Sequence, residues 1–311
     1  MMTTDDDGAG PGAPTDPGAR APAIPRSTPD DATATLLVRL AGPLQSWGTQ
    51  SRFLVRDAGS EPSKSGVIGL ACAALGRPRT APVDDLARLR FGVRVDHPGT
   101  VRRDYHTAGG TAYHRPAPGR RDGLGIWHDG KVETQTVISY RYALHDASFL
   151  AALEGPLGLL RALDAALGAP VWATYLGRKA FVPAVPLRLP EEPPHGPGLR
   201  LGRLDDALEA IPWTPWGRTP RARPAGEAPG EPPGEGATRR LRCVLDAAPG
   251  DDGAEEWRDD VPLDFATRSF GARLVRTTWI DVPALGADPL APARRDRTQP
   301  VPGTPLEGGD R

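Results

Sequence analysis

Basic and aromatic side chains are interspersed through residues 94–145, a combination that suits single-stranded nucleic acid. The window holds eight basic residues, five acidic residues and five aromatic side chains. Cationic groups neutralise phosphates, while exposed rings stack on unpaired bases. A twisted hairpin with a charged outer face would have the same composition, so that alternative stays open. The aromatic residues are Tyr105, Tyr113, Trp127, Tyr140 and Tyr142.

The segment from Gly59 to Ser65, GSEPSKS, is close to a phosphate-binding loop but has Ser63 where that motif needs its second glycine. The missing glycine disfavours a nucleotide triphosphatase, because the backbone must wrap the phosphates closely at that position. A weaker interpretation is that Lys64, Ser65 and the free N–H groups of a helix start bind one backbone phosphate. A plain capped helix explains the same residues.

Histidine is concentrated in the same basic window, which contains five of the six histidines. Their spacing includes no H-x-x-x-H pair, and no C-x-x-C knuckle accompanies them. A G-x-S-x-G nucleophile elbow is also absent from the sequence. We therefore expect hydrogen-bonded or solvated histidines, with no metal and no cofactor.

The near-neutral total charge of -1 hides a basic middle between acidic flanks. Residues 36–190 hold 20 basic and 12 acidic residues, whereas residues 191–311 hold 16 and 21. Only three of the 38 cations are lysines, and arginine has a planar fork that suits phosphates and base edges. A GC-rich genome explains the arginine bias equally well.

Composition also predicts the compartment. Two cysteines are too few for a disulfide framework, and the sequence has neither a secretory leader nor a run of about 18 apolar residues. We expect a soluble cytoplasmic protein with no membrane partner.

Hydrophobic patterning predicts the elements that must position these groups. The first strand has two faces, because Leu37 and Arg39 alternate with Leu36, Val38 and Leu40. The predicted strands cover 36–40, 91–95, 101–106, 132–142, 147–153, 241–245 and 273–280, and the predicted helices cover 64–75, 83–89 and 157–167.

The order of these elements fits an α+β fold with a ferredoxin-like βαββαβ core, in which apolar runs at 181–189 follow the last helix. A hairpin is inserted in the middle of the core. The predicted organisation is a disordered extension (1–32), a ferredoxin-like domain (33–190) with the hairpin at about 100–143, a small β-rich part with a Pro/Gly-rich insert (191–283) and a flexible tail (284–311).

The run LVRLAGPLQSWG, from Leu37 to Gly48, resembles the opening of the CasD family. That family is the subunit of the type I-E CRISPR Cascade complex that holds the 5′ handle of the guide RNA. Five further blocks are similar, and together they span roughly residues 35–280. They are PSKSGVIGL at 62–70, RDYHT at 103–107, DASF at 146–149, YLGRK at 175–179 and FATR at 265–268.

This resemblance implies a RAMP fold, meaning a ferredoxin-like domain with a protruding hairpin, or thumb, and a small second domain. It also implies a non-catalytic role in antiviral defence, in which the chain holds the 5′ handle of a CRISPR guide RNA. The implied protein partners are the backbone and large subunits of Cascade. The sequence departs from the family in its N-terminal extension, its 190–236 insert and its acidic tail, to which we assign no role.

A protein that holds one RNA end benefits from a rigid sheet, phosphate anchors and aromatic platforms. Trp47, just after the first strand, either stacks on a base or fills the core, and the sequence leaves both open. The candidate RNA-binding residues are Arg39, Trp47, Lys64, Ser65, Arg102, Arg103, Tyr105, His106, Arg178 and Lys179.

Two other functions compete with the scaffold. In a metal-independent endoribonuclease that processes CRISPR precursor RNA, His106, Tyr105 and Lys64 would activate a 2′-hydroxyl. A pure protein-interaction module leaves the basic middle unexplained. The resemblance favours the scaffold, because a separate subunit processes the precursor in that subtype, but residue types alone do not decide whether the chain is an enzyme.

Overall fold

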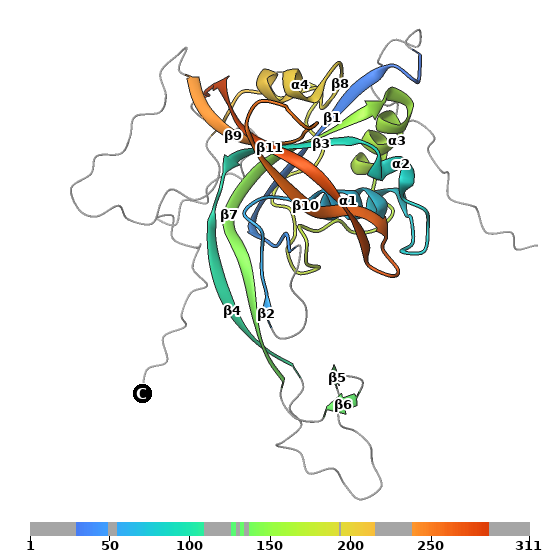
Figure 1. The fold of residues 1–311 in the computed structure, drawn as a ribbon, viewed down its shortest axis with the longest axis vertical. Helices are drawn as coiled ribbons and strands as arrows, with labels where there is room; N and C mark the ends of the chain where they lie inside the picture. Colours follow the sequence, from blue (N-terminus) through green and yellow to red (C-terminus); the bar gives the residue numbers. More distant parts are fainter. Residues whose placement is uncertain are drawn as a thin grey trace, which may run out of the picture.

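One long strand organises the molecule. The computed structural model describes residues 29–48, 55–108, 126–128, 131–133, 137–192, 194–214 and 238–285. Strand β7 (Val137–Pro156) runs through a large antiparallel sheet with the order β10-β11-β9-β3-β7-β1-β8. Its C-terminal half lies between β1 (Thr33–Gln45) and β3 (Arg90–His97), and its N-terminal half extends beyond the body of the sheet (Figure 1).

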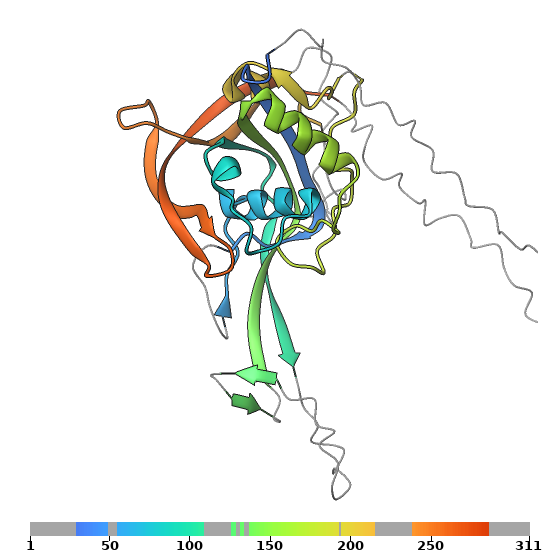
Figure 2. The ribbon, with the colours of Figure 1, turned by 90° about the vertical axis from the view of Figure 1, so that its right-hand side faces the viewer.

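Helices cover both faces of the central strands. The helices α1 (Lys64–Leu75), α2 (Asp84–Ala87) and α3 (Leu157–Gly168) lie on one face, where they enclose the larger core (Figure 2). Helix α4 (Leu204–Ala210) packs on the other face. Strand β1 is therefore buried on both sides, as expected for a strand that reads as a continuous apolar run. The three helices predicted from the sequence are confirmed.

A hairpin projects from this body. Strand β4 (Thr100–Ala108) pairs antiparallel with the outer half of β7, from Thr100 opposite His145 to Ala108 opposite Val137. The short β2 (Val55–Arg56) pairs parallel with the same part of β7. Strands β5 (Ile126–His128) and β6 (Lys131–Glu133) form a separate pair. The remainder of the predicted tip, including Tyr113, lies outside the described residues.

Two sequence-based expectations for the sheet are wrong. The strands predicted at 132–142 and 147–153 are not separate, because residues 137–142 and 147–153 belong to β7, whereas residues 132–133 belong to β6. Asp146 within β7 has a left-handed φ of 55°, which aspartate tolerates better than most residues. The apolar runs at 181–189, which would supply the last strand of the βαββαβ core, form no strand and contribute one isolated bridge, from Arg188 to Val38. Prolines at 183 and 186 remove backbone donors there, and β8 (Leu199–Leu201) pairs with β1 instead.

The C-terminal strands continue the same sheet. Strand β9 (Thr238–Asp246) pairs with β3, and β11 (Ser269–Pro283) and β10 (Ala254–Asp264) follow outward. The strands predicted at 241–245 and 273–280 are confirmed. Strand β10 was not predicted, because its acidic residues mask the alternation. These strands curl over the side of the sheet that carries α1 (Figure 2).

Candidate nucleic-acid interface

One face of the hairpin presents an arginine and two exposed rings together. Tyr105 lies directly opposite Tyr140, with ring centroids 6.0 Å apart, and the Arg103 guanidinium lies 4.9 Å from the centroid of the Tyr140 ring. Tyr105 is 58% exposed and Tyr140 is 38% exposed. Large apolar rings are normally covered, so this exposed pair is available for stacking. Alternation along the strand predicted at 101–106 puts Arg103 and Tyr105 on one face, and the pairing of β4 with β7 confirms this prediction.

The opposite face of the hairpin carries Arg102, Asp104 and His106 from β4 and Arg141 from β7, because successive residues of a strand alternate between faces. Arg102 is exposed, and Nδ1 of His106 lies 4.0 Å from a carboxylate oxygen of Asp104. Among its described residues, this face mixes charges of both signs and has no exposed ring pair.

A polar cleft of about 920 Å³ adjoins the root of the hairpin. Its walls come from the loop after β1, strand β2, the start of α1, the loop at Gly177 and Arg178, and the β10–β11 turn. The cleft therefore gathers residues from distant parts of the sequence. Its charged and hydroxyl-bearing lining residues are Ser46, Arg56, Asp57, Ser63, Ser65, Arg178, Asp259 and Arg268.

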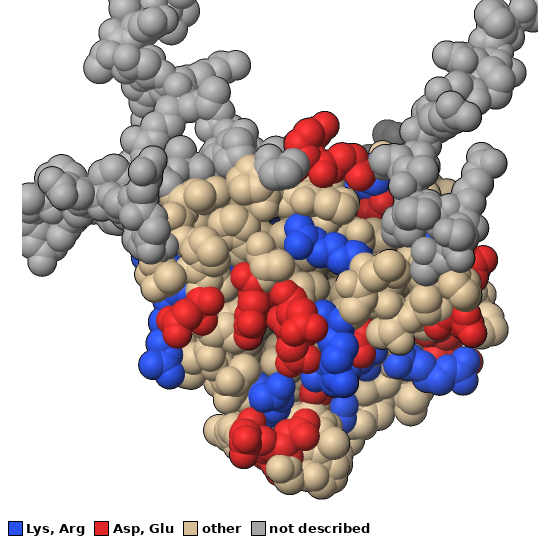
Figure 3. Space-filling view, turned by 90° about the horizontal axis from the view of Figure 1, so that it is seen from above, with Lys and Arg blue, Asp and Glu red and all other residues tan. Residues whose placement is uncertain are grey.

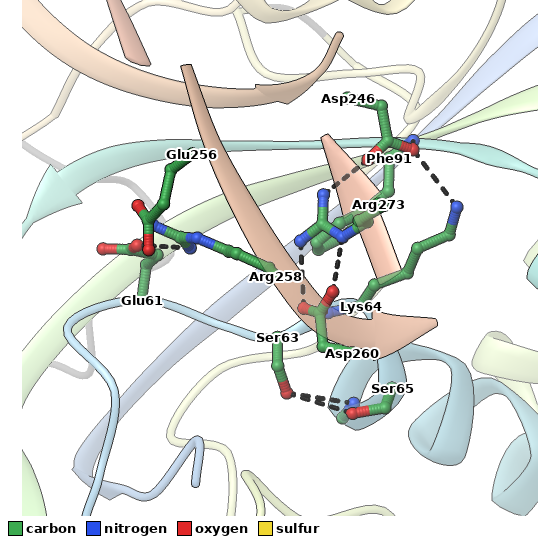
Figure 4. Close-up of polar contacts among 11 residues, drawn as sticks. Glu61, Ser63, Lys64, Ser65, Phe91, Asp246, Glu256, Arg258, Asp260 and Arg273 are labelled. Atoms are coloured by element: carbon green, nitrogen blue, oxygen red, sulfur yellow. Dashed lines mark hydrogen bonds and ion pairs between the residues drawn. The ribbon is translucent and has the colours of Figure 1, made fainter. Parts of the chain in front are cut away.

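Lys64 does not face this cleft freely. Its side chain is buried, and Nζ lies 3.1 Å from Oδ2 of Asp246 (Figure 4). Its backbone N–H donates to Oδ2 of Asp260 at 2.8 Å, and the N–H of Gly66 donates to the Ser63 hydroxyl. Two helix-start donors and the lysine are thus already paired. The expected phosphate anchor built on Lys64 is not formed, although Ser65 lines the cleft.

The paired Lys64 belongs to a buried ionic network that fastens the C-terminal strands to α1. Arg273 donates to both carboxylate oxygens of Asp260, at 2.5 and 2.9 Å, and to Asp246 at 2.5 Å. Beside it, Glu61 lies 2.7 Å from the guanidinium of Arg258. The network therefore ties the cleft wall contributed by β10 and β11 to α1 and β9.

Arg39 is also structural. It is 6% exposed on the face of β1 that α4 covers, and its Nη2 donates to the Thr214 hydroxyl at 3.2 Å. Alternation along the strand correctly predicted that Arg39 lies on the face opposite to Leu36, Val38 and Leu40, but the helix covers that face. Arg39 therefore contributes no exposed surface to an RNA interface.

Trp47 fills the core. It is 1% exposed, and its indole N–H donates to Oε1 of Gln45 at 2.9 Å. Gln45 in turn donates to the carbonyls of Leu40 and Ala147. The sequence left two roles open for Trp47, and the structure shows that it fills the core, because a buried ring cannot stack on a base. The Gln45–Gly48 segment is therefore a hydrogen-bonded corner that ends β1.

This corner predicts the effect of a methyl group on α1. A Cβ at Gly66 would lie 2.9 Å from a ring carbon of the buried Trp47, whereas a Cβ at Gly69 would have no neighbour closer than 3.7 Å. We expect Gly66→Ala to lower the free energy of unfolding by about 1–2 kcal/mol through overpacking. Gly69→Ala should instead raise it by up to about 1 kcal/mol through helix propensity. Urea unfolding of both variants measures the difference, and equal effects would contradict the packing argument.

Arg178 stands at the hairpin root, whereas Lys179 is exposed beside it. Nη2 of Arg178 donates to the backbone carbonyl of Tyr142 at 3.0 Å. The preceding Gly177 has a φ of +88°, and a Cβ there would lie 1.8 Å from the carbonyl oxygen of Ser46. Only glycine fits this close approach, which sets the position of Arg178.

The three groups considered for ribonuclease chemistry are not gathered at one point. Tyr105 and His106 lie on opposite faces of the hairpin, and Lys64 is buried against Asp246. Acid–base catalysis requires its groups to lie within hydrogen-bond reach of the same reacting atoms.

Sequence reasoning left Arg56, Arg141 and Arg268 out of the site. Arg141 was counted only as one charge of the basic window, and Arg268 only as part of the FATR block. Arg56 had no local signal, since its place depends on the parallel pairing of β2 with β7.

The described helices include none long and apolar enough to cross a membrane.

The face of the body opposite the hairpin carries charges of both signs. On the face seen from above in Figure 3, opposite the projecting hairpin, basic and acidic side chains are interspersed. Among the described residues in view, that face has no uniformly basic patch.

The fold and this interface define a class: an α+β protein with a large antiparallel sheet and a projecting hairpin that carries cations and exposed rings. The family model described as CRISPR-associated protein (Cas_Cas5) matches residues 35–276. The chain therefore belongs to the Cas5 family of CRISPR-associated proteins.

Individual relatives agree with this family. The chain is 32% identical over 160 residues to the CRISPR system Cascade subunit CasD of Escherichia coli (strain K12), a match that covers 50% of this chain and 69% of the relative. A crystal structure of a Cas protein matches with a TM-score of 0.53 and 38% identity, covering 80% of this chain and 97% of the other. A chain of a CRISPR RNA-guided surveillance complex matches with a TM-score of 0.58 and 33% identity, covering 81% and 94%.

Proposed function

We propose that the chain is a non-catalytic RNA-binding subunit of a type I-E CRISPR Cascade complex in the cytoplasm, where it holds the 5′ handle of the guide RNA for antiviral defence. Its partners would be that RNA and the backbone and large subunits. The relatives support membership in such a complex, because one is named a Cascade subunit and another belongs to an RNA-guided surveillance complex.

The observation that carries the RNA-binding role is the exposed face formed by Arg103, Tyr105 and Tyr140. An arginine stacked on one ring beside a second exposed ring offers both a phosphate partner and a platform for bases. The hairpin holds these groups clear of the body, so a strand of RNA can pass across them.

We also propose the finer fold assignment, a RAMP fold with a ferredoxin-like core, the hairpin as its thumb and a smaller β-rich C-terminal part. The strand order β8-β1-β7-β3, with α1 and α3 as the connecting helices, supports the βαββαβ arrangement. The boundary predicted between 33–190 and 191–283 falls before β8, so in this proposal the core extends past 190 to include that strand.

Binding to RNA tests the proposed function. The full chain should bind an RNA handle, taken from the CRISPR repeat of the same genome, more tightly than an RNA of scrambled sequence. Affinity should fall as salt rises, because phosphate contacts release counterions. Fluorescence anisotropy at several salt concentrations measures both properties. Equal affinity for the two RNAs would contradict handle recognition.

Incubation of the same protein with labelled repeat RNA in EDTA tests the competing enzyme. If the chain is a non-catalytic scaffold, the labelled RNA should remain intact. A discrete product that disappears in His106→Ala would replace the scaffold with a metal-independent ribonuclease.

A further inference from the structure

Three arginines from separate segments meet at the root of the hairpin. Arg56 of β2 is the direct partner of Arg141 in the parallel pairing of β2 with β7, so their side chains leave the same face of adjacent strands. Arg178 reaches the next residue of β7, where it donates to the carbonyl of Tyr142. Arg56 and Arg178 both line the polar cleft.

Little opposite charge neutralises this group. Within the described part of the chain, no carboxylate forms an ion pair with Arg56, Arg141 or Arg178. Burial and the neighbouring positive charges lower the pKa of Arg141 and of Arg178, and Asp104 offsets this only in part. The cleft also contains Asp57 and Asp259, together with Arg268. Like charges held together in this way are stabilised by an anion.

The available donors match a phosphate. Arg141 uses Nε toward the Ser139 hydroxyl and Arg178 uses Nη2 toward the Tyr142 carbonyl, which leaves further guanidinium N–H groups. Guanidinium forks bind phosphate oxygens in paired hydrogen bonds. The hydroxyl of Ser65 lies in the same cleft.

We infer that Arg56, Arg141 and Arg178 form a subsite for one phosphate group of a bound RNA strand. The inference rests on the proposed function, because it assumes that RNA is the ligand of this surface. The subsite lies on the side of the hairpin to which Arg102 and His106 point, so the RNA would contact it in addition to the ring-bearing face.

The test compares Arg141→Gln/Arg178→Gln with Arg79→Gln/Arg203→Gln, a matched control that removes two exposed arginines away from the hairpin. Affinity for handle and scrambled RNAs is measured against salt, with 5′-hydroxyl and 5′-phosphorylated forms of each. The first variant should bind about ten-fold more weakly. Its logarithmic salt slope should fall by about 0.7 for the lost phosphate contact, while the control keeps the slope of the unchanged chain.

A phosphate contact carries no sequence information, so the slope should change with both RNAs. A change with every RNA identifies a phosphodiester, and a change only with 5′-phosphorylated RNA identifies a terminal phosphate. If both variants bind alike while the unchanged chain still prefers the handle, the subsite is refuted and the proposed function stands. If the first variant keeps its RNA affinity but no longer assembles with other subunits, an acidic protein surface is the ligand and the inference is overturned.

Discussion

A chain with Arg103→Ala and Tyr105→Ala is expected to bind the guide-RNA handle at least about ten-fold more weakly than the unchanged chain, because one phosphate contact and one stacking platform are lost. Stacking alone contributes about 1–3 kcal/mol per base. Both side chains are exposed, so the substitutions should leave the fold intact. Anisotropy measures the affinity, and circular dichroism checks the fold.

Arg102→Ala with His106→Ala is the matched control from the opposite face of the same strand, and we expect it to cause the smaller loss. The reverse ranking would move the base-stacking surface to that face. If neither double variant weakens handle binding or Cascade assembly while both stay folded, the hairpin does not hold the RNA.

Asp260→Ala should lower the free energy of unfolding by about 3 kcal/mol or more, because removal of one partner leaves a buried charge poorly compensated. Asp260 is 1% exposed and accepts from Arg273 and from the backbone of Lys64. The variant should also loosen the attachment of β10 and β11 to α1. The midpoint and slope of urea unfolding measure the loss.

Asp259→Ala is the control for this prediction, since Asp259 is the exposed neighbour of Asp260 on β10. Exposed substitutions usually change stability by no more than about 0.5 kcal/mol. Equal unfolding midpoints for the two variants would show that the buried network contributes little to the attachment.

Features that depend on neighbouring residues could be predicted from the amino-acid sequence. The helix predicted over 64–75 is present, with Ser63 as its N-cap and Gly76 in the left-handed conformation at its end, and Arg103 and Tyr105 share one face of their strand. Alternation and capping are local properties of the backbone, so they follow without knowledge of distant contacts.

The polar residues that remain free to bind a ligand could be identified only from long-range contacts. Lys64 pairs with Asp246, 182 residues away, and its N–H with Asp260, 196 residues away. Arg56, Arg141 and Arg178 are likewise brought together by strand pairing and by a loop contact. Burial and charge compensation depend on which surfaces meet after folding, and no short stretch of sequence encodes that meeting.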